Sequence, residues 1–585
     1  MLSFSSFFFF FEKMSKLLDT SAKVLLCGKR EVSYPWPVEL SVLLKEPEFA
    51  ATNEEGPVVG VIVNGIVTSL ACTLDVHEAT VAPVHLYTWE GMSMYRRTLV
   101  FVLGAATARC FDGKRVMAQH KVGNNGYKLV VDDGEYVVTD EDVTALKTAM
   151  DDLIKRDLRI DERWLSIKEA VAHFEATNRP FSRASVLTSN AEKHRVTVCD
   201  GYAALYFRAL CHRTGIVSTY DVRRCSEDGG MVLVFPSQRP GKEGGFVMPG
   251  AEEKIEDPLL SHVYQEYHSW GKVVGAGSAG QLNERILEGS AKQLVATCEA
   301  LQTHKIVELA LAMKEHIKNG LKLVLIAGPS ASGKTTFASK LGIQLRIVGC
   351  TPVVLSVDNY FKPRVETPKD ENGKYDFECL EALRIDALNA DLLRLMNGEV
   401  VKTPIFDFKT GTIIHDALPL QLPKQGVLIM EGIHCLNEKL TYLIPPEAKY
   451  KVFIAPLAQI KLDELNFQSQ TVGRLIRRIV RDYRGRGFSA RETLARWRSV
   501  TAGEEKYIFP FMPQADFVFN SALEHECSVL KVYVTPLLRS VTPDMEEYNL
   551  ARNLIGVLDS FYPIPHDDVP PDSLLREFVG GSFFE

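Results

Sequence analysis

Residues 321–345 read LKLVLIAGPSASGKTTFASKLGIQL, a short apolar run followed by a loop bracketed by glycines and then a helical stretch. The loop, from Gly328 to Thr335, fills every fixed position of the pattern G-x-x-x-x-G-K-[ST]. Glycines let backbone N–H groups turn inward around phosphate oxygens, and the amino end of a helix adds a favourable dipole. The stretch therefore predicts a phosphate-binding strand, loop and helix.

The loop also predicts what individual residues do. Lys334 is expected to reach the β and γ phosphates of ATP, and Thr335 to offer its hydroxyl to the Mg²⁺ that bridges them. The residues expected to bind the nucleotide are Gly328, Ser330, Ser332, Gly333, Lys334, Thr335 and Thr336. The alternative is a plain glycine-rich turn, but average residue usage would produce this pattern in such a chain only roughly once in fifty tries.

Further short apolar runs follow the loop, each separated from the next by helical stretches. They are Pro352–Val357, Gly426–Met430, Tyr450–Ala455 and Asp516–Phe519. Bare apolar runs of this length are typical of strands buried on both faces of a parallel sheet. Residues 321–540 are therefore predicted to form an α/β domain with helices on both sides of the sheet.

Two acids follow these runs directly. Asp358 comes after the second run, at the sheet edge where the phosphates are expected, and could take a proton from an attacking hydroxyl. The alternative for Asp358 is a helix cap. Glu431 comes after the third run and could hold Mg²⁺ directly or through water; the alternative is a cap or a surface charge.

Residues 474–498 contain nine arginines but only two acids, Asp482 and Glu492. The guanidinium groups of arginines form bidentate hydrogen bonds to phosphate oxygens and can neutralise charge on a transferred group. Because Gly485 and Gly487 interrupt the segment, it suits a mobile lid over ATP. A solvated basic face and an RNA-binding patch are the alternatives.

The bulk composition indicates several folded domains. The chain has 585 residues, 46% of them hydrophobic, and a formal net charge of -7, which argues against a chain that coats nucleic acid along its whole length. Its 11 cysteines include no C-x-x-C pair, which favours a reduced, cytoplasmic protein. No apolar run is long enough to cross a membrane. Residues 1–19 are interpreted as a disordered leader, with Met14 as an alternative start.

The first half of the chain gives weaker signals. The hairpin signal Asn64-Gly65 predicts a small β-rich module over residues 20–90. Residues 91–290 are expected to be α+β, 291–320 a connecting helix, and 541–585 a C-terminal extension. The expected helices and β segments of the middle region are Arg96–Arg109, Asp140–Arg156, Leu165–Glu175, Gly126–Val138 and Gly230–Phe235.

Residues 321–540 resemble the uridine kinase and phosphoribulokinase family of P-loop kinases. The resemblance rests on the motifs GPSASGKTT, SVDNYF, YDF, PIFDF, EGIH and RDYRGRG. It implies that Asp358 is the catalytic base and Glu431 the acid associated with magnesium. It also implies that Arg481, Arg484 and Arg486 belong to the lid, and that Lys334, Arg481 and Arg486 take part in catalysis.

The same resemblance bears on the acceptor, which it implies is a nucleoside such as uridine, phosphorylated at its 5′-hydroxyl. Uridine kinases usually carry an N-F-D-H-P-like segment whose aspartate binds ribose, and here Glu378 stands at that place without His-Pro. Their P-V-Y-D-F-x-x-H segment supplies an aromatic residue and a histidine to the base. This chain has Phe406 and Gly411 at those positions, so the histidine is missing.

The first 290 residues resemble the amino-terminal part of threonyl-tRNA synthetases, a TGS β-grasp module followed by an editing-type domain. In that domain an H-x-x-x-H pair and a C-x-x-x-H segment help form a metal-bearing site. Here the first stretch runs from Arg97 to Phe101 and the second from Cys199 to Ala203. Because these histidines are absent, the resemblance implies a degenerate domain that binds no catalytic zinc and edits no tRNA.

Together these observations predict an ATP-dependent, Mg²⁺-requiring kinase that acts on a small, nucleoside-like molecule. The alternative from another class is an RNA-binding or nucleotide-sensing regulatory protein that uses its synthetase-like modules. The partner of the N-terminal region stays open between RNA and a small ligand, no membrane partner is expected, and a homo-oligomer also stays open.

Overall fold

The computed structural model describes residues 21–52, 54–111, 113–123, 125–225, 229–238, 245–250, 258–369, 373, 375–407, 410–424, 426–457 and 460–584. The predicted leader, residues 1–19 with Met14, lies outside them. The chain divides into two compact units. The first unit comprises Met1–Ile255, Lys461–Phe467 and Val541–Ser560, and the second comprises Glu256–Ile460, Gln468–Ser540 and Phe561–Glu585.

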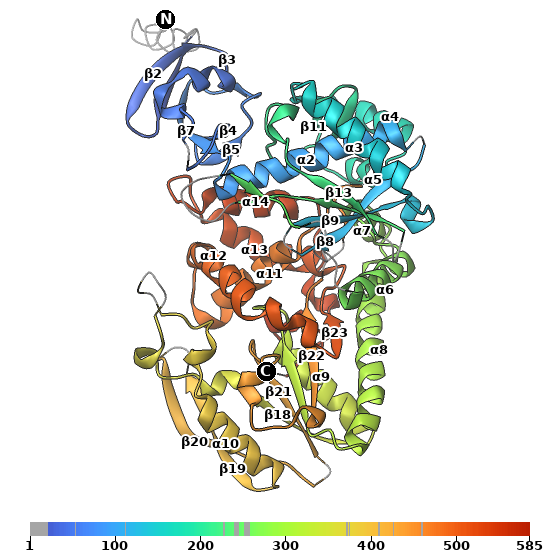
Figure 1. Cartoon of the computed structure of the whole chain (residues 1–585), viewed down its shortest axis with the longest axis vertical. Helices are drawn as coiled ribbons and strands as arrows, with labels where there is room; N and C mark the ends of the chain where they lie inside the picture. The colour runs from blue at the N-terminus through green and yellow to red at the C-terminus, as the bar shows by residue number, and fades with distance from the viewer. Residues whose placement is uncertain are drawn as a thin grey trace, which may run out of the picture. The chain divides into compact units, whose positions relative to one another are not determined.

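The first unit begins with a five-stranded sheet in the order β2-β1-β7-β4-β5 (Figure 1). The strands are β1 (Ser21–Leu26), β2 (Arg30–Pro35), β4 (Val58–Val63), β5 (Ile66–Thr68) and β7 (Glu78–His85); β3 (Val38–Glu39) pairs with β6 (Thr73–Leu74) beside them. Asn64 and Gly65 make the turn between β4 and β5 with φ angles of 49° and 81°. Since glycine and asparagine tolerate positive φ, this hairpin forms as predicted, and the small β-rich module is confirmed.

The rest of the first unit is α+β. Its helices are α2 (Trp89–Cys110), α3 (Asp140–Lys155), α4 (Ile167–Ala176), α5 (Pro180–Leu187) and, from the C-terminal part of the chain, α14 (Tyr548–Leu558). Antiparallel sheets join β8 (Val116–Val122), β9 (Gly126–Val131), β13 (Asp221–Arg224) and β14 (Met231–Val234), then β10 (Asp161–Ser166), β11 (Lys193–Cys199) and β12 (Tyr202–Leu205), and finally β15 (Ser237–Gln238) and β16 (Phe246–Val247).

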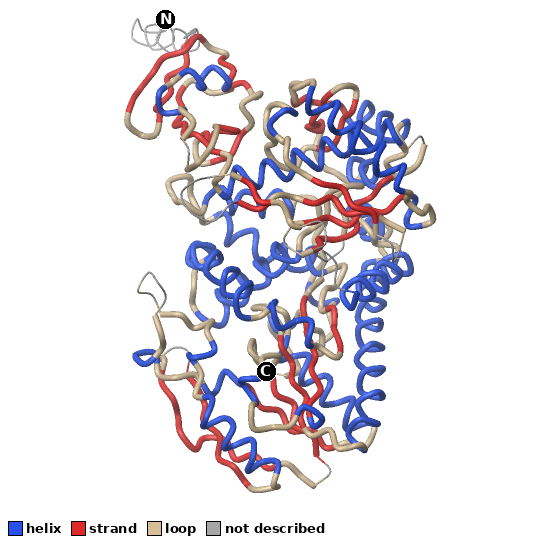
Figure 2. Tube along the Cα trace, in the orientation of Figure 1, coloured by secondary structure: helices blue, strands red, loops and turns tan. Residues whose placement is uncertain are grey.

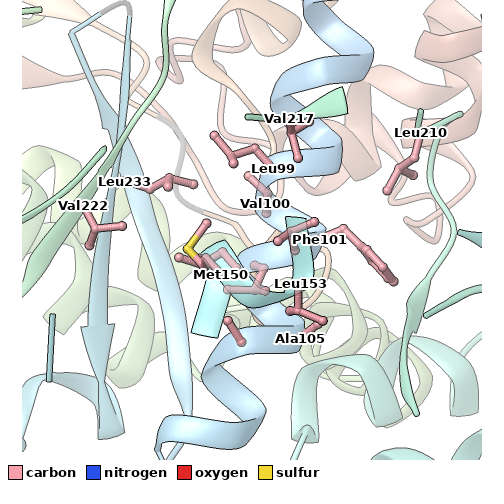
Figure 3. Packing of buried hydrophobic residues seen from close by; sticks show 14 of the residues in the cluster. Leu99, Val100, Phe101, Ala105, Met150, Leu153, Leu210, Val217, Val222 and Leu233 are labelled. Atoms are coloured by element: carbon pink, nitrogen blue, oxygen red, sulfur yellow. The ribbon is translucent and has the colours of Figure 1, made fainter. Parts of the chain in front are cut away.

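The core of this part forms around α2. Figure 3 shows Leu99, Val100 and Phe101 of α2 close to Met150 and Leu153 of α3. All five side chains are buried. Apolar side chains therefore cover most of α2, which explains why this helix carries little helical periodicity in the sequence.

Three predicted boundaries in this region were wrong by two residues or more. The helix expected from Arg96 starts at Trp89, because the side chain of Thr88 accepts the N–H of Gly91 and caps the helix there. The β segment expected to reach Val138 ends at Val131, because Asp132 takes a φ of 47° and starts a turn. The helix expected from Leu165 starts at Ile167, because the side chain of Ser166 accepts the N–H of Glu169 and caps the helix there.

The second unit is built on a five-stranded sheet that is wholly parallel, as predicted, and its strand order is β18-β21-β17-β22-β23. Figure 2 draws the strands in red and the helices in blue. Its strands are β17 (Leu323–Ala327), β18 (Thr351–Ser356), β21 (Gly426–Glu431), β22 (Lys449–Ala455) and β23 (Phe517–Asn520). Along β17, Leu323 and Leu325 belong to one buried cluster, whereas Val324 and Ile326 belong to another. Since successive side chains point to opposite faces, the sheet is buried on both sides.

Among the helices of the second unit, α9 (Lys334–Ile347) and α6 (Pro258–Val274) contact strands of this sheet. The unit also contains α7 (Ala279–Leu287), α8 (Ala291–Lys318), α10 (Ile385–Met396), α11 (Gln470–Arg481), α12 (Ala490–Tyr507), α13 (Glu526–Arg539) and α15 (Arg576–Val579). The long helix α8 confirms the predicted helix at 291–320. A hairpin of β19 (Val400–Asp407) and β20 (Thr412–Gln421) lies beside α10 (Figure 1). Among the described residues, no helix is both long and apolar enough to span a bilayer.

Candidate active site

The loop between β17 and α9 has the backbone that its glycines predict. A Cβ atom on Gly328 would come 2.0 Å from the carbonyl oxygen of Ile454, so only glycine fits there. Gly333, the residue before α9, has a φ of 89°, and Ala331 has a φ of 59°. The loop therefore curls tightly between strand and helix, which places the amino end of α9 at the carboxyl edge of the sheet.

The side chains of the loop face different partners. Lys334 donates hydrogen bonds from Nζ to the carbonyl oxygens of Gly328 (2.9 Å) and Pro329 (3.2 Å), so its ammonium lies inside the curl. Thr335 is exposed, whereas Ser332 is buried and its Oγ forms no hydrogen bond with the described residues. The exposed hydroxyl of Thr335 and the ammonium of Lys334 are thus the polar groups of the loop that a nucleotide phosphate can reach.

Sequence reasoning missed a carboxylate that supports the loop. Glu504 of α12 accepts the backbone N–H of Ser330 at 3.0 Å and forms a buried ion pair with Arg474 of α11. Arg478 donates to the hydroxyl of Ser330 at 2.7 Å. Helices α11 and α12 therefore fix one side of the loop. No local pattern marks Glu504, which the sequence shows as one of two neighbouring glutamates in a helix.

Asp358 lies immediately after β18, in the turn Val357–Tyr360. Burial raises the pKa of its carboxyl above the ordinary value, while Lys334, Arg486 and Arg481 lower it. Electrostatic interactions therefore link four of the predicted site residues, one half-buried carboxylate and three cations. A carboxylate whose pKa is raised accepts a proton more readily than an ordinary aspartate does.

Glu431 ends β21 next to Asp358. Its Oε1 accepts the hydroxyl of Ser356 at 2.7 Å, and burial together with the charge of Asp358 raises the pKa of its carboxyl. Two neighbouring acids with raised pKa values, Glu431 buried and Asp358 half-buried, are a chemically suitable setting for a divalent cation. No group of three or more His, Cys, Asp or Glu side chains suited to a metal occurs among the residues that the structure describes.

The arginines of α11 and the following π-helical turn (Asp482–Arg486) divide into two groups. Arg474 and Arg477 are fully buried in ion pairs with Glu504 and Glu526, so the alternative of a solvated basic face is wrong for these two. Asp482 is buried and lies within ion-pair distance of three others, Arg478, Arg481 and Arg486. That second group contains the two arginines that act on Asp358.

Arg484 lies elsewhere. Its guanidinium donates to the carbonyl oxygen of Phe578 at 2.8 Å, so the C-terminal segment holds it. The same segment reaches the P-loop helix, because Glu577 accepts the hydroxyl of Thr336 at 3.0 Å. Sequence reasoning treated 541–585 as an extension and missed both contacts, which join residues 94 and 241 positions apart.

The residues predicted to bind the acceptor flank this cluster. Glu378 lies against Gly503, and burial raises the pKa of its carboxyl to about 7, while Arg478 lowers it. Phe406 is buried, with its ring centroid 5.6 Å from that of Phe361. Gly411 accepts the backbone N–H of Arg364 at 2.9 Å.

Comparison with known proteins agrees with this geometry. The model of the phosphoribulokinase / uridine kinase family matches residues 323–528. A uridine kinase of Ureaplasma urealyticum is 29% identical over 180 residues, which cover 31% of this chain and 78% of the relative. A uridine kinase of Chlamydia pneumoniae is 30% identical over 202 residues, 34% of this chain and 82% of the relative.

Among solved structures, a possible uridine kinase from Bacillus stearothermophilus shares 18% identity, with a TM-score of 0.23 and coverage of 36% of this chain and 100% of that one. The family match falls on the parallel sheet, the P-loop and the arginine segment. The chain therefore belongs to the phosphoribulokinase / uridine kinase family and is an ATP-dependent phosphotransferase.

Proposed function

We propose that this phosphotransferase moves the γ-phosphoryl group of ATP to the 5′-hydroxyl of a nucleoside, with Mg²⁺ as cofactor. One observation carries the proposal: the half-buried carboxylate of Asp358, directly after β18 at the carboxyl edge of the sheet, interacts electrostatically with the cations of Lys334, Arg486 and Arg481. Because Glu431 is assigned to Mg²⁺, a nucleotide-binding domain that only senses ATP would have no need for a second carboxylate at the phosphate end of its site. A phosphoryl transfer to a hydroxyl does need a group that takes the proton.

In the proposed reaction the acceptor oxygen attacks the γ-phosphorus, and the bond from this phosphorus to the oxygen that bridges it to the β-phosphate breaks. Asp358 takes the proton of the hydroxyl, and ADP leaves with the bridging oxygen. Lys334, Arg481 and Arg486 stabilise the negative charge that spreads over the transferred group. Catalysis rests on positioning and charge, because the phosphoryl transfer forms no covalent bond to the protein.

Thr335 and Glu431 are the residues that would hold Mg²⁺, the first by its exposed hydroxyl and the second by its buried carboxylate. Bound there, the ion would neutralise charge on the β and γ phosphates. Ser356 fixes the carboxylate of Glu431 by its hydrogen bond, so the orientation of this acid is set before any ligand binds.

Glu378 and Phe406 are proposed to bind the nucleoside. Since the pKa of Glu378 is raised to about 7, its carboxyl is partly protonated near neutral pH and can both accept from and donate to ribose hydroxyls. Phe406 offers an aromatic face for the base. The two relatives described above are uridine kinases, which supports an acceptor of this class.

The test is a screen of acceptors with ATP labelled at the γ-phosphate, using uridine, cytidine, adenosine, guanosine and ribose. We expect label on the 5′-oxygen of at least one nucleoside, dependent on Mg²⁺. Label on ribose alone would reject the nucleoside as acceptor. Absence of label from all five compounds in a protein that still binds ATP would reject the whole acceptor class.

A further inference from the structure

A cavity of about 570 Å³ opens in the first unit, and none of the residues assigned above to phosphotransfer lines it. Its walls come from α2, from the chain between α4 and α5, from β11 and β12 with the residues that follow, and from residues 463–466. The volume lies within the usual range of sites for small molecules. All lining residues belong to the same compact unit.

The walls carry more positive than negative side chains. The cations are Arg97, Arg109, Lys114, Arg115, Arg179 and Arg208, and the acids are Asp200, Asp463 and Glu464.

The acids already have partners. Glu464 accepts the N–H groups of Phe181 (2.8 Å) and Ser182 (3.3 Å). Asp463 accepts the N–H of Asn466 at 2.7 Å, and Asp200 is paired with Arg156 at 3.0 Å and with Arg109 of the cavity wall. Within the described residues, the other wall cations, Arg97, Lys114, Arg115, Arg179 and Arg208, form no ion pair with these acids, so the cavity keeps an excess of positive charge.

Several polar groups of the walls have no partner. Arg208 forms no hydrogen bond or ion pair with any residue that the structure describes. Burial lowers the pKa of the neighbouring Arg97 guanidinium, and the positive charge of Arg208 lowers that pKa further. Buried atoms without a hydrogen bond to described residues are Arg115 Nε, His173 Nε2 and Thr197 Oγ1. Unsatisfied buried donors and neighbouring like charges are costly, and one bound anion would relieve both.

Apolar side chains complete the walls. Phe101, Tyr202, Leu205, Phe207 and Leu210 line the cavity beside the cations. Arg179 lies over the ring of Tyr202 at 4.2 Å from its centroid, which shows that a flat cationic group already packs on an aromatic face here. The ligand that fits both kinds of wall has an anionic head and an apolar or aromatic body.

We propose that this cavity binds a small molecule that carries a phosphate or carboxylate group on an apolar or aromatic body. Arg208 is the principal anion-binding residue, and Arg115, His173 and Thr197 offer further hydrogen bonds. The site is an addition to the phosphotransfer site of the second unit and does not depend on the identity of its acceptor.

Covalent continuity gives the site a route to the kinase. Residues 463–466 follow β22 in the sequence but belong to the first unit, where Glu464 accepts the N–H of Ala118 through its backbone oxygen at 2.9 Å. Four residues after this segment the chain enters α11 at Gln470. That helix carries Arg478 and Arg481, so a ligand that shifts 463–466 would change the position or mobility of these arginines.

Binding is tested by calorimetry on the full chain, with Mg²⁺ and ADP present to fill the P-loop. The probes are phenyl phosphate, benzoate and inorganic phosphate, and the fourth titrant is tRNA. Phenyl phosphate and benzoate carry the two candidate anionic groups, phosphate and carboxylate, on the same aromatic ring. Comparing their affinities shows which group the cavity binds. We expect at least one of them to bind, and its affinity to fall roughly tenfold or more in Arg208→Gln, since a charged hydrogen bond is lost.

Arg208→Lys keeps the charge and should retain part of the affinity. The control is Arg163→Gln, at an exposed residue of β10 outside the cavity, which should retain the full affinity. If Arg208→Gln does not fold, Thr197→Val replaces it, because it removes one hydroxyl from the same wall at nearly constant volume. Equal affinity in Arg208→Gln and Arg163→Gln would overturn the proposal, as would the absence of binding by every probe. If tRNA is the only titrant that binds, and Arg208→Gln weakens its binding, the proposal is overturned in favour of an RNA-binding surface.

The route to α11 has its own readout. Hydrogen exchange of the amides of Gln470–Arg481 should change when the bound probe is added to the natural chain, and should not change in Arg208→Gln. Changes confined to the residues of the cavity would contradict the transmission while leaving the binding site in place.

Discussion

The carboxylate of Glu504, on helix α12, accepts a hydrogen bond from the backbone N–H of Ser330 at 3.0 Å, so α12 is tied to the main chain of the P-loop. The charge of Glu504 is balanced by Arg474 of α11, which also lies 3.4 Å from the carbonyl oxygen of Ser330. Both side chains are almost fully buried. The shape of the nucleotide site thus depends on an ion pair between two helices that lie between β22 and β23 in the sequence.

Glu504→Gln should destabilise the protein and weaken ATP binding. Glutamine keeps an acceptor for Ser330 but leaves the guanidinium of Arg474 buried without a counter-charge, which typically costs about 3–5 kcal/mol. The thermal midpoint and the KM for ATP measure the two effects. Glu505→Gln, at the exposed neighbouring position, is the control. Unchanged stability in Glu504→Gln would show that the pair does not support the loop.

Lys334→Ala should lose affinity for ATP more than it loses the fold. The ammonium is expected to pair with the β and γ phosphates, and a charged hydrogen bond contributes about 10- to 100-fold in affinity. Calorimetric titration with ATP measures the loss, and Lys318→Ala, exposed at the end of α8, serves as the control. ATP affinity equal to that of the natural protein would remove Lys334 from the site.

In a plot of kcat/KM against pH, the fall on the acid side (the acid limb) should lie at a pH above the pKa of an ordinary aspartate. Burial raises the pKa of Asp358 over its usual 3.8, and only the ionised form accepts a proton, so kcat/KM falls as the pH drops through the raised pKa. Arg486 lowers this pKa, so Arg486→Gln should move the limb to still higher pH. Profiles of kcat/KM against pH for the natural chain, Arg486→Gln and the exposed-site control Arg491→Gln decide the matter. A limb that stays in place in Arg486→Gln would argue against Asp358 as the titrating group.

Much of the second unit could be predicted from the sequence because its signals are local. The P-loop pattern is contiguous, and buried parallel strands are bare apolar runs, so Lys334, Asp358 and Glu431 could be placed at one edge of the sheet. Glu504 and Glu577 could not, because their partners Ser330 and Thr336 lie 174 and 241 residues away.

The arginine segment shows the same limit. Counting its arginines and acids could not show which arginines are buried, because burial depends on acids contributed by other helices. Arg477 is enclosed because Glu526 of α13 faces it, whereas Arg481 pairs with Asp482 in its own segment. In the first unit, the cavity wall formed by residues 463–466 is equally non-local, since this segment follows β22 of the other unit.

Discrimination among bases should be weak or should differ from that of uridine kinases with the usual histidine. A site that hydrogen-bonds a polar group can reject an analogue without it by roughly 10⁴-fold, and Gly411 offers no side chain for this. Arg364 occupies the space where a side chain at Gly411 would point. Values of kcat/KM for uridine, cytidine, adenosine and guanosine under the same conditions measure the selectivity. Strong and exclusive use of uridine would contradict this prediction.

The most direct test of the account is the rate of phosphoryl transfer to the accepted nucleoside in Asp358→Asn, with ATP affinity measured on the same preparation. Asparagine keeps the size of the side chain but cannot take the proton. We predict a loss of about 10²- to 10⁴-fold in kcat with ATP affinity nearly unchanged. A variant that folds, binds ATP and transfers the phosphoryl group at close to the natural rate would contradict the central claim that Asp358 is the base of this kinase.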